Sequence, residues 1–202
     1  MMNNKPSFLK SGDTLICFGD SLTAAPNGYV SFLKKKLPEI HIINAGLNGD
    51  KTPAALMRYK TDVLDLKPQA ISIFLGTNDA AIGRGRWSDE PMVSAEGYYT
   101  NLCWMVHLAR LASIQNISIA TPFFRFEGPA YVDQGNILNE YCLAARKAAA
   151  TMNTWLIPLD VMSAEEWACT SCHSGLLLTQ DGVHPTLQTY EKIADKMIES
   201  WN

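Results

Sequence analysis

Five short apolar runs constrain the fold of this chain most, because each is followed by a turn or loop and then by a segment of helical periodicity. The first run, Thr14 to Phe18, ends abruptly at Gly19, and apolar residues then recur at helical spacing from Tyr29 to Leu37. The other predicted strands are 40–43, 70–75, 117–120 and 155–158. The other predicted helices are 56–66, 98–109, 137–150 and 187–201. Strands that alternate with helices predict an α/β fold in which a parallel sheet has helices on both faces.

The length and composition indicate one globular unit. The chain has 202 residues, of which 47% are hydrophobic and 18% charged, enough to bury a sizeable core without disulfides or metals. No internal repeat, low-complexity tract or linker divides the sequence. We therefore expect a single domain over residues 1–202.

The charge balance argues against a polyanionic partner. Seventeen basic and twenty acidic residues give a formal net charge of -3, which provides no large positive field for a nucleic acid or an anionic membrane. The basic run Lys34 to Lys36 closes a predicted amphipathic helix, where cations complement the helix dipole. We interpret that run as a solvated helix face.

The N-terminal stretch and the cysteines favour a cytoplasmic location. Residues 1–15 lack the apolar core of about 7 to 15 residues that a secretory signal needs, and no window approaches a membrane span of about 20 apolar residues. Of five cysteines, Cys17, Cys103 and Cys142 fall within apolar patterns, which is typical of free thiols. The Cys169-x-x-Cys172-His173 spacing suits either a loop with accidental spacing or a labile redox or metal site, and the sequence does not assign its role.

Small polar residues follow several of the predicted strands. Right-handed crossovers place every strand-to-helix loop at one edge of a parallel sheet, so Ser21, Gly49, Asn78 and the 123–127 loop should converge there. A serine hydroxyl at such an edge is a candidate nucleophile. It is weak unless a base takes its proton, so a histidine must reach the same edge.

His184 is the best of four candidate bases. It lies in a turn just before the last predicted helix, and Asp181 stands three residues earlier, close enough to bind Nδ1 and leave Nε2 free to act on Ser21. His41, His107 and His173 are better explained as packed or solvated histidines. Asp181 and Thr186 could instead merely form and cap a turn.

Acyl transfer also requires hydrogen-bond donors for the oxyanion. The backbone N–H groups of Ser21 and Gly49 and the side-chain amide of Asn78 are available in the strand-end loops. Taken singly, Gly49 could be a turn glycine and Asn78 a capping residue. Only their combination with Ser21 and His184 points to catalysis.

These four segments together resemble the sequence blocks of the SGNH hydrolases, also called the GDSL esterase/lipase family. The blocks are Gly19-Asp-Ser-Leu22, Asn44 to Gly49, Gly76-Thr-Asn-Asp79 and Asp181-Gly-Val-His-Pro185, in the family's order and across nearly the whole chain. The resemblance implies a flavodoxin-like three-layer α/β/α sandwich with a central five-stranded parallel sheet. It also implies ester hydrolysis with Ser21 as nucleophile, His184 as base, Asp181 as its orienting group, and Ser21, Gly49 and Asn78 as the oxyanion hole.

The sequence predicts a serine esterase that forms an acyl-enzyme and needs no metal or organic cofactor. The same residues could act as a lysophospholipase, a thioesterase or an acyltransferase. A binding module for acylated ligands is an alternative of another class, which an intact catalytic set makes less attractive. A flavin is disfavoured because no strand-end loop has a hydroxyl-rich run to hold its phosphate.

The substrate is expected to be a small or short-chain acyl ester such as an acetylated carbohydrate. Candidate pocket residues are the aromatics Trp87, Phe123, Phe124 and Phe126, with Arg84, Arg86 or Arg125 reaching for an anionic group. Aromatics that follow a strand are more often part of the core. The sequence leaves the acyl chain length, the alcohol and the oligomeric state open.

Overall fold

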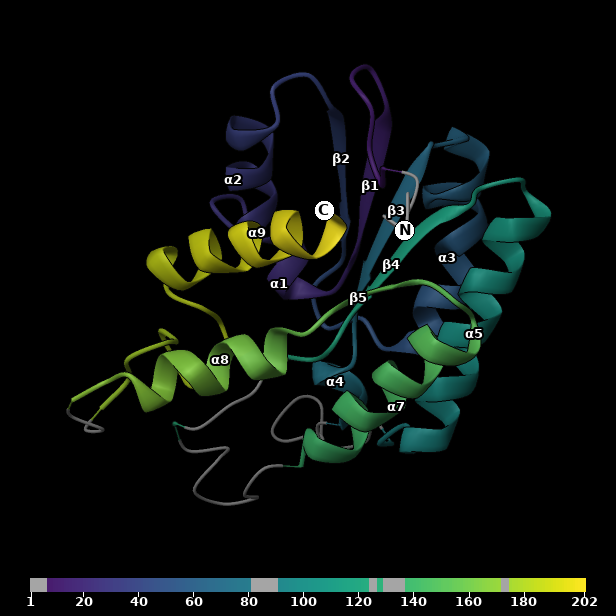
Figure 1. Cartoon of the computed structure of the whole chain (residues 1–202). Helices are drawn as coiled ribbons and strands as arrows, with labels where there is room; N and C mark the ends of the chain where they lie inside the picture. The colour runs from purple at the N-terminus through teal and green to yellow at the C-terminus, as the bar shows by residue number, and fades with distance from the viewer. Residues whose placement is uncertain (1–6, 81–90, 124–126, 129–136, 172–174) are drawn as a thin grey trace, which may run out of the picture.

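A five-stranded parallel sheet forms the centre of the protein (Figure 1). The computed structural model describes residues 7–80, 91–123, 127–128, 137–171 and 175–202. The strands are β1 (Thr14–Gly19), β2 (His41–Gly46), β3 (Ala70–Phe74), β4 (Asn116–Ala120) and β5 (Trp155–Ile157). Their order across the sheet is β2-β1-β3-β4-β5, and each neighbouring pair is parallel.

Helices cover both faces of the sheet and make three layers (Figure 1). One face carries α2 (Tyr29–Lys36), α8 (Leu159–Ala168) and α9 (Leu187–Trp201). The other carries α3 (Thr52–Asp62), α5 (Ala95–Leu111) and α7 (Asn139–Thr151). Three short elements, α1 (Ser21–Ala24), the 3-10 turn η1 (Leu64–Leu66) and α4 (Thr77–Ala80), complete the described helices. The predicted α/β/α sandwich with a five-stranded parallel sheet is confirmed.

The continuously apolar sequence of β1 is explained by its position between two helical layers. Ile16 and Phe18 pack into the core beneath α3, α5 and α7, whereas Leu15 and Cys17 pack into the core beneath α2 and α9. All four side chains are fully buried. A strand with helices on both faces has no solvent side, so its sequence reads as an apolar run rather than an alternation.

The structure differs from the sequence-based prediction in several elements: the predicted helix 56–66 is α3 followed by the 3-10 turn η1, and the predicted loops at Ser21 and Asn78 are the short helices α1 and α4. Strand β2 continues through Asn44 to Gly46, which were predicted as loop, because these residues pair in register with Cys17 to Gly19 of β1. Helix α8 was not predicted. Its buried residues lie in its first half, so its sequence shows little helical periodicity, and packing against α9 supports it.

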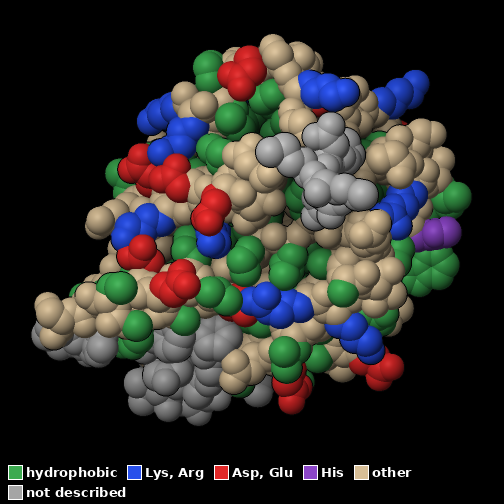
Figure 2. Space-filling view, viewed as in Figure 1, with side chains coloured by type: hydrophobic (Ala, Val, Ile, Leu, Met, Phe, Trp, Pro, Cys, Tyr) green, Lys and Arg blue, Asp and Glu red, His purple; other side chains and the backbone are tan. Residues whose placement is uncertain are grey.

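The surface charges near α9 agree with the expected solvated face. Lys36 at the end of α2 pairs with Glu191 and Asp195 of α9 at 3.2 and 2.9 Å. Figure 2 shows acidic and basic side chains interspersed over this side of the molecule. Within the residues that the structure describes, no helix combines the length and the apolar character needed to cross a bilayer.

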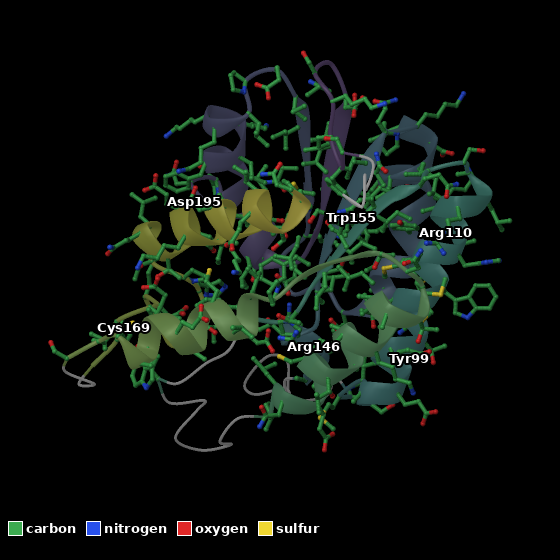
Figure 3. All side chains as sticks on the ribbon, in the orientation of Figure 1. Tyr99, Arg110, Arg146, Trp155, Cys169 and Asp195 are labelled. Atoms are coloured by element: carbon green, nitrogen blue, oxygen red, sulfur yellow. The ribbon has the colours of Figure 1, made fainter. Side chains whose placement is uncertain are left out.

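Among the cysteines, Cys17 and Cys142 are buried, Cys103 is half-buried and Cys169 is exposed at the end of α8 (Figure 3); all four are free thiols. Cys172 and His173 lie outside the described residues. The two buried thiols agree with the prediction of free cysteines in apolar segments. The structure adds nothing to the interpretation of the Cys169 to His173 spacing.

An ion pair between Arg146 and Asp160 connects the segments that follow β4 and β5. Arg146 of α7 donates to both carboxylate oxygens of Asp160 at 2.6 and 2.8 Å (Figure 3), and the hydroxyl of Thr121 donates to Asp160 at 2.8 Å. A bidentate arginine–carboxylate pair sets geometry as well as charge. These contacts join α7, α8 and the end of β4 at the edge of the sheet to which Ser21 also belongs.

Candidate active site

The candidate site lies at the carboxyl ends of β1 and β3. These neighbouring strands pair in register up to Gly19 and Phe74, and the chain turns to opposite sides of β1 for β2 and β3. Open α/β sheets bind ligands at such a switch point. Ser21 follows β1 as the first residue of α1, and Asn78 follows β3 within α4. The predicted convergence of these two loops is therefore observed.

Ser21, His184 and Asp181 form a connected series of side chains. The Ser21 Oγ lies 3.1 Å from His184 Nε2, although 163 positions separate the two residues. His184 Nδ1 lies 2.7 Å from Asp181 Oδ2. Because a carboxylate only accepts, Nδ1 carries the proton and Nε2 is left to accept from the serine hydroxyl. The turn is anchored by the helix that follows, whose N-cap Thr186 accepts from the N–H of Thr189.

The carboxylate of Asp181 also shapes the backbone of its turn. Its Oδ1 accepts from the N–H groups of Val183 and His184 at 2.9 and 2.7 Å. Desolvation works to raise the pKa of Asp181, but the hydrogen bonds from His184 and Val183 bring it below its ordinary value. The side chains of His184 and Asp181 are 42% and 53% exposed, so the pair adds little to folding stability. The main effect of the Asp181–His184 contact is to orient the imidazole ring.

The expected oxyanion donors lie in the adjoining loops. Gly49 sits in a turn with φ of +77°, a conformation that disfavours a side chain. Asn78 Nδ2 donates to Asp20 Oδ2 at 3.2 Å and to the carbonyl of Asp50 at 3.1 Å. A side-chain amide has two hydrogens, so these two acceptors fix the orientation of Asn78 beside Ser21.

Asp20 is a buried carboxyl that the sequence analysis did not single out. Its Oδ1 caps α1 by accepting from the N–H of Leu22 at 2.9 Å, and its Oδ2 accepts from Asn78. Desolvation is the main cause that raises the pKa of Asp20 from 3.8 to about 7. The hydrogen bond from the N–H of Leu22 and the charge of His184 lower the pKa of Asp20. The charges of Asp79 and Asp50 raise it further.

We expect this raised pKa to make stability depend on pH. Between pH 3.8 and about 7 the folded protein holds the Asp20 proton more tightly than the unfolded chain does. The free energy of unfolding should therefore fall as pH rises through this window. Asp20→Asn removes the titration, so urea unfolding at pH 4.5 to 7.5 should show the variant gaining stability relative to the wild type as pH rises. A pH-independent difference between the two proteins would contradict the assignment to Asp20.

Arg58 of α3 is another residue that sequence reasoning missed. Its guanidinium donates to Asp50 Oδ2 at 2.8 Å and to the carbonyls of Ala45 and Gly19 at 3.0 Å each. One side chain thus joins the ends of β1 and β2 to the residue whose carbonyl holds Asn78. An arginine on an amphipathic helix is ordinarily solvated, and no spacing in the sequence connects Arg58 to these partners.

Of the candidate pocket residues, only Phe123 lies among the residues that the structure describes. Phe123 is 1% exposed and packs in the core beneath α2 and α9. The sequence allowed either a pocket position or a core position for this side chain. The remaining candidates, Arg84, Arg86, Trp87, Phe124, Arg125 and Phe126, lie outside the described residues.

Comparison with known proteins identifies the family. The profile of the GDSL-like Lipase/Acylhydrolase family matches residues 17–192. An acetylxylan esterase from Geobacillus stearothermophilus is 26% identical over 202 residues, which cover 88% of each chain. The uncharacterized lipoprotein YqeF of Bacillus subtilis (strain 168) is 34% identical over 116 residues, which cover 52% of this chain and 46% of that protein.

The solved structures agree on the fold. LAE5, an alpha/beta hydrolase enzyme from the metagenome of Lake Arreo, Spain, superposes with a TM-score of 0.84 at 21% identity, over 97% of this chain and 98% of that one. Identity at this level shows the shared architecture alone. The profile match, which spans most of the sequence, shows the family. The chain belongs to the GDSL-like lipase/acylhydrolase family and is a hydrolase that acts on ester bonds.

Proposed function

We propose that this protein is a serine esterase in which Ser21 attacks the ester carbonyl, His184 is the general base and Asp181 orients His184. One observation carries the proposal: the contacts of 3.1 Å from Ser21 to His184 and 2.7 Å from His184 to Asp181 occur together. Turn formation alone accounts for the contacts of Asp181 with its own loop. It does not account for a histidine nitrogen placed against a serine hydroxyl from the other end of the chain.

The contacts support a two-step reaction. As Ser21 Oγ bonds to the ester carbonyl carbon, His184 Nε2 takes the hydroxyl proton and then gives it to the departing alcohol, which leaves an acyl-enzyme. A water molecule loses a proton to the same nitrogen and attacks the acyl carbon. Cleavage of the acyl–Ser21 bond returns that proton to the serine and releases the carboxylic acid.

The negative oxygen of each tetrahedral intermediate needs donors nearby. The N–H of Ser21 is the first of α1 and has no acceptor within that helix. Asn78 Nδ2 lies beside it with both hydrogens donated, to Asp20 and to the carbonyl of Asp50, so one of these two bonds must be exchanged for a bond to the oxyanion, and the Gly49 turn completes the proposed oxyanion hole. Backbone N–H groups, which their turns hold in place before the reaction, stabilise the developing charge without reorganising during it.

For the substrate we propose a short acyl group on a carbohydrate, as in acetylated sugars. The relative from Geobacillus stearothermophilus, named an acetylxylan esterase, supports this class. Lysophospholipids and acyl thioesters are the alternatives, since the same residues would cleave them. Transfer of the acyl group to an alcohol or amine would use the same acyl-enzyme.

A series of 4-nitrophenyl esters from acetate to dodecanoate tests the substrate class. We expect kcat/KM to be highest for acetate and to fall with chain length, with Ser21→Ala measured alongside as the blank. A maximum at eight or more carbons would instead favour a lipid-type substrate. Adding glycerol or xylose as competing acceptor and analysing the products separates hydrolysis from transfer: new esters would show a transferase.

A further inference from the structure

The proposed acid–base pair lies on a loop with little regular structure. Residues 178–186 lie between α8 and α9, and an isolated antiparallel bridge joins Thr179 to Pro185 within this segment. The N–H of Gln180 donates to the carbonyl of His184 at 2.8 Å. These contacts shape the loop, but they do not attach it to the sheet edge at which Ser21 lies.

Glu127 provides such an attachment. It is 5% exposed and comes from the loop after β4, some fifty residues before the partners it binds. Its Oε2 accepts from the N–H of Leu177 at 2.7 Å. Its Oε1 accepts from the N–H groups of Leu178 and Thr179 at 2.9 and 2.6 Å, and from the Thr179 hydroxyl at 2.6 Å. Four donors around one buried carboxylate make a strong and directional anchor.

Thr179 extends this anchor to the catalytic turn. Its hydroxyl donates its single hydrogen to Glu127 and accepts from the N–H of Gly182 at 3.0 Å. Gly182 is the neighbour of Asp181 and lies two residues before His184. Because Glu127 takes the hydroxyl hydrogen, a lone pair of Thr179 remains directed at Gly182.

A backbone contact reinforces the same connection. A Cβ added to Gly128 would meet the Cα of Gly182 at 2.5 Å, and one added to Gly182 would meet the Cα of Gly128 at 2.9 Å. The backbone segments at Gly128 and Gly182 are therefore in direct contact, with no side chain between them. The residue after Glu127 packs directly on the residue after Asp181.

We propose that Glu127, acting through Thr179, is a positioning residue that sets the distance between His184 and Ser21. The inference rests on the proposed function, because it assigns a role relative to the same acid–base pair. Glu127 makes no contact with Ser21, so its role is to place the base, not to react. A displacement of the imidazole by about 1 Å can cost on the order of 100-fold in rate.

The test compares two substitutions at Thr179. Thr179→Val keeps the shape but removes both hydroxyl bonds, and we expect kcat on 4-nitrophenyl acetate to fall about 10- to 100-fold with KM changed less than threefold. Thr179→Ser keeps the hydroxyl and should retain at least half of wild-type kcat. Glu127→Gln keeps the volume but turns an N–H₂ toward a backbone N–H, and should lose kcat as Thr179→Val does.

A spectroscopic measurement separates positioning from general destabilisation. The proton shared by His184 Nδ1 and Asp181 should give a low-field ¹H NMR signal in the wild type and in Thr179→Ser, and a broadened or missing one in Thr179→Val. Glu165→Gln, the same chemical change at an exposed carboxyl, should leave both the signal and kcat unchanged. Full activity and an intact signal in Thr179→Val would overturn the inference.

The outcome for Ser21→Ala keeps the two proposals distinguishable. If Ser21→Ala is inactive while Thr179→Val behaves as wild type, the esterase mechanism stands and the positioning role is wrong. If Ser21→Ala keeps its activity, the proposed mechanism is wrong, and the NMR signal still reports whether Glu127 and Thr179 hold the His184–Asp181 pair.

Discussion

Ser21→Ala should lower kcat on 4-nitrophenyl acetate by about 10⁴- to 10⁶-fold, the largest effect we expect from any single substitution. In the proposed mechanism the hydroxyl 3.1 Å from His184 Nε2 supplies the attacking oxygen, and alanine offers no other atom to form the acyl-enzyme. Residual turnover then comes from water and the oxyanion donors alone. The fold should persist, because Ser21 lies in a short helix whose cap is Asp20. Steady-state kinetics with circular dichroism on the same samples check both expectations.

A double variant sharpens this prediction. Because the proposed mechanism has Ser21 and His184 act in one step, the double variant Ser21→Ala with His184→Ala should be about as slow as either single variant, and the two losses should not multiply. Multiplicative losses would show that the two side chains act independently. Turnover of Ser21→Ala within tenfold of the wild type would exclude Ser21 as the nucleophile.

Asn78→Ala should lower kcat by about 10²- to 10³-fold while changing KM little. In the proposed mechanism the side-chain amide exchanges one of its present acceptors for the oxygen that becomes negative after attack, so loss of the amide raises the energy of the transition state more than that of the bound ester. Asn78 also donates to Asp20 and to the carbonyl of Asp50, so the substitution should lower the melting temperature as well. Kinetics and thermal unfolding measured together separate the two contributions.

Asn116→Ala is the matched control for Asn78→Ala. Asn116 begins β4 and its amide donates to the carbonyl of Phe8 at 2.9 Å, so the same atoms and one hydrogen bond are removed away from the strand ends that carry Ser21. We expect some loss of stability with kcat unchanged. If Asn78→Ala lost only a fewfold in kcat with a similar loss of stability, Asn78 would be a structural residue.

Much of the fold follows from local patterns. Each strand of the sheet is a short apolar run, and the long helices α2, α3, α5, α7 and α9 show the spacing that predicts them. The positions of Ser21 and Asn78 follow from one rule, because loops after parallel strands share an edge. His184 is predictable because a serine nucleophile needs a base, and only one histidine lies in a turn beside a carboxyl group.

The remaining features depend on partners distant in sequence. Asn44 to Gly46 read as loop, yet pairing with β1 makes them strand. Arg58 and Glu127 each bind residues that no periodicity connects to them, and their carbonyl and N–H partners have no signature in the sequence. Asp20 is visible in its motif, but its burial, and hence its raised pKa, depends on the folded surroundings.

The pairing of β1 with β3 affects the order in which parts of the site are lost on warming. Ser21 and Asn78 continue from two adjacent central strands, so separating them requires opening the middle of the sheet. His184 instead stands on a turn outside the sheet, held by the hydrogen bonds of Glu127 and Thr179 and by the contact of Gly128 with Gly182, and segments outside the sheet open locally at a lower free energy than the core. Warming should therefore separate His184 from Ser21 and Asn78 before the sheet opens. Reversible inactivation would then precede melting of the sheet.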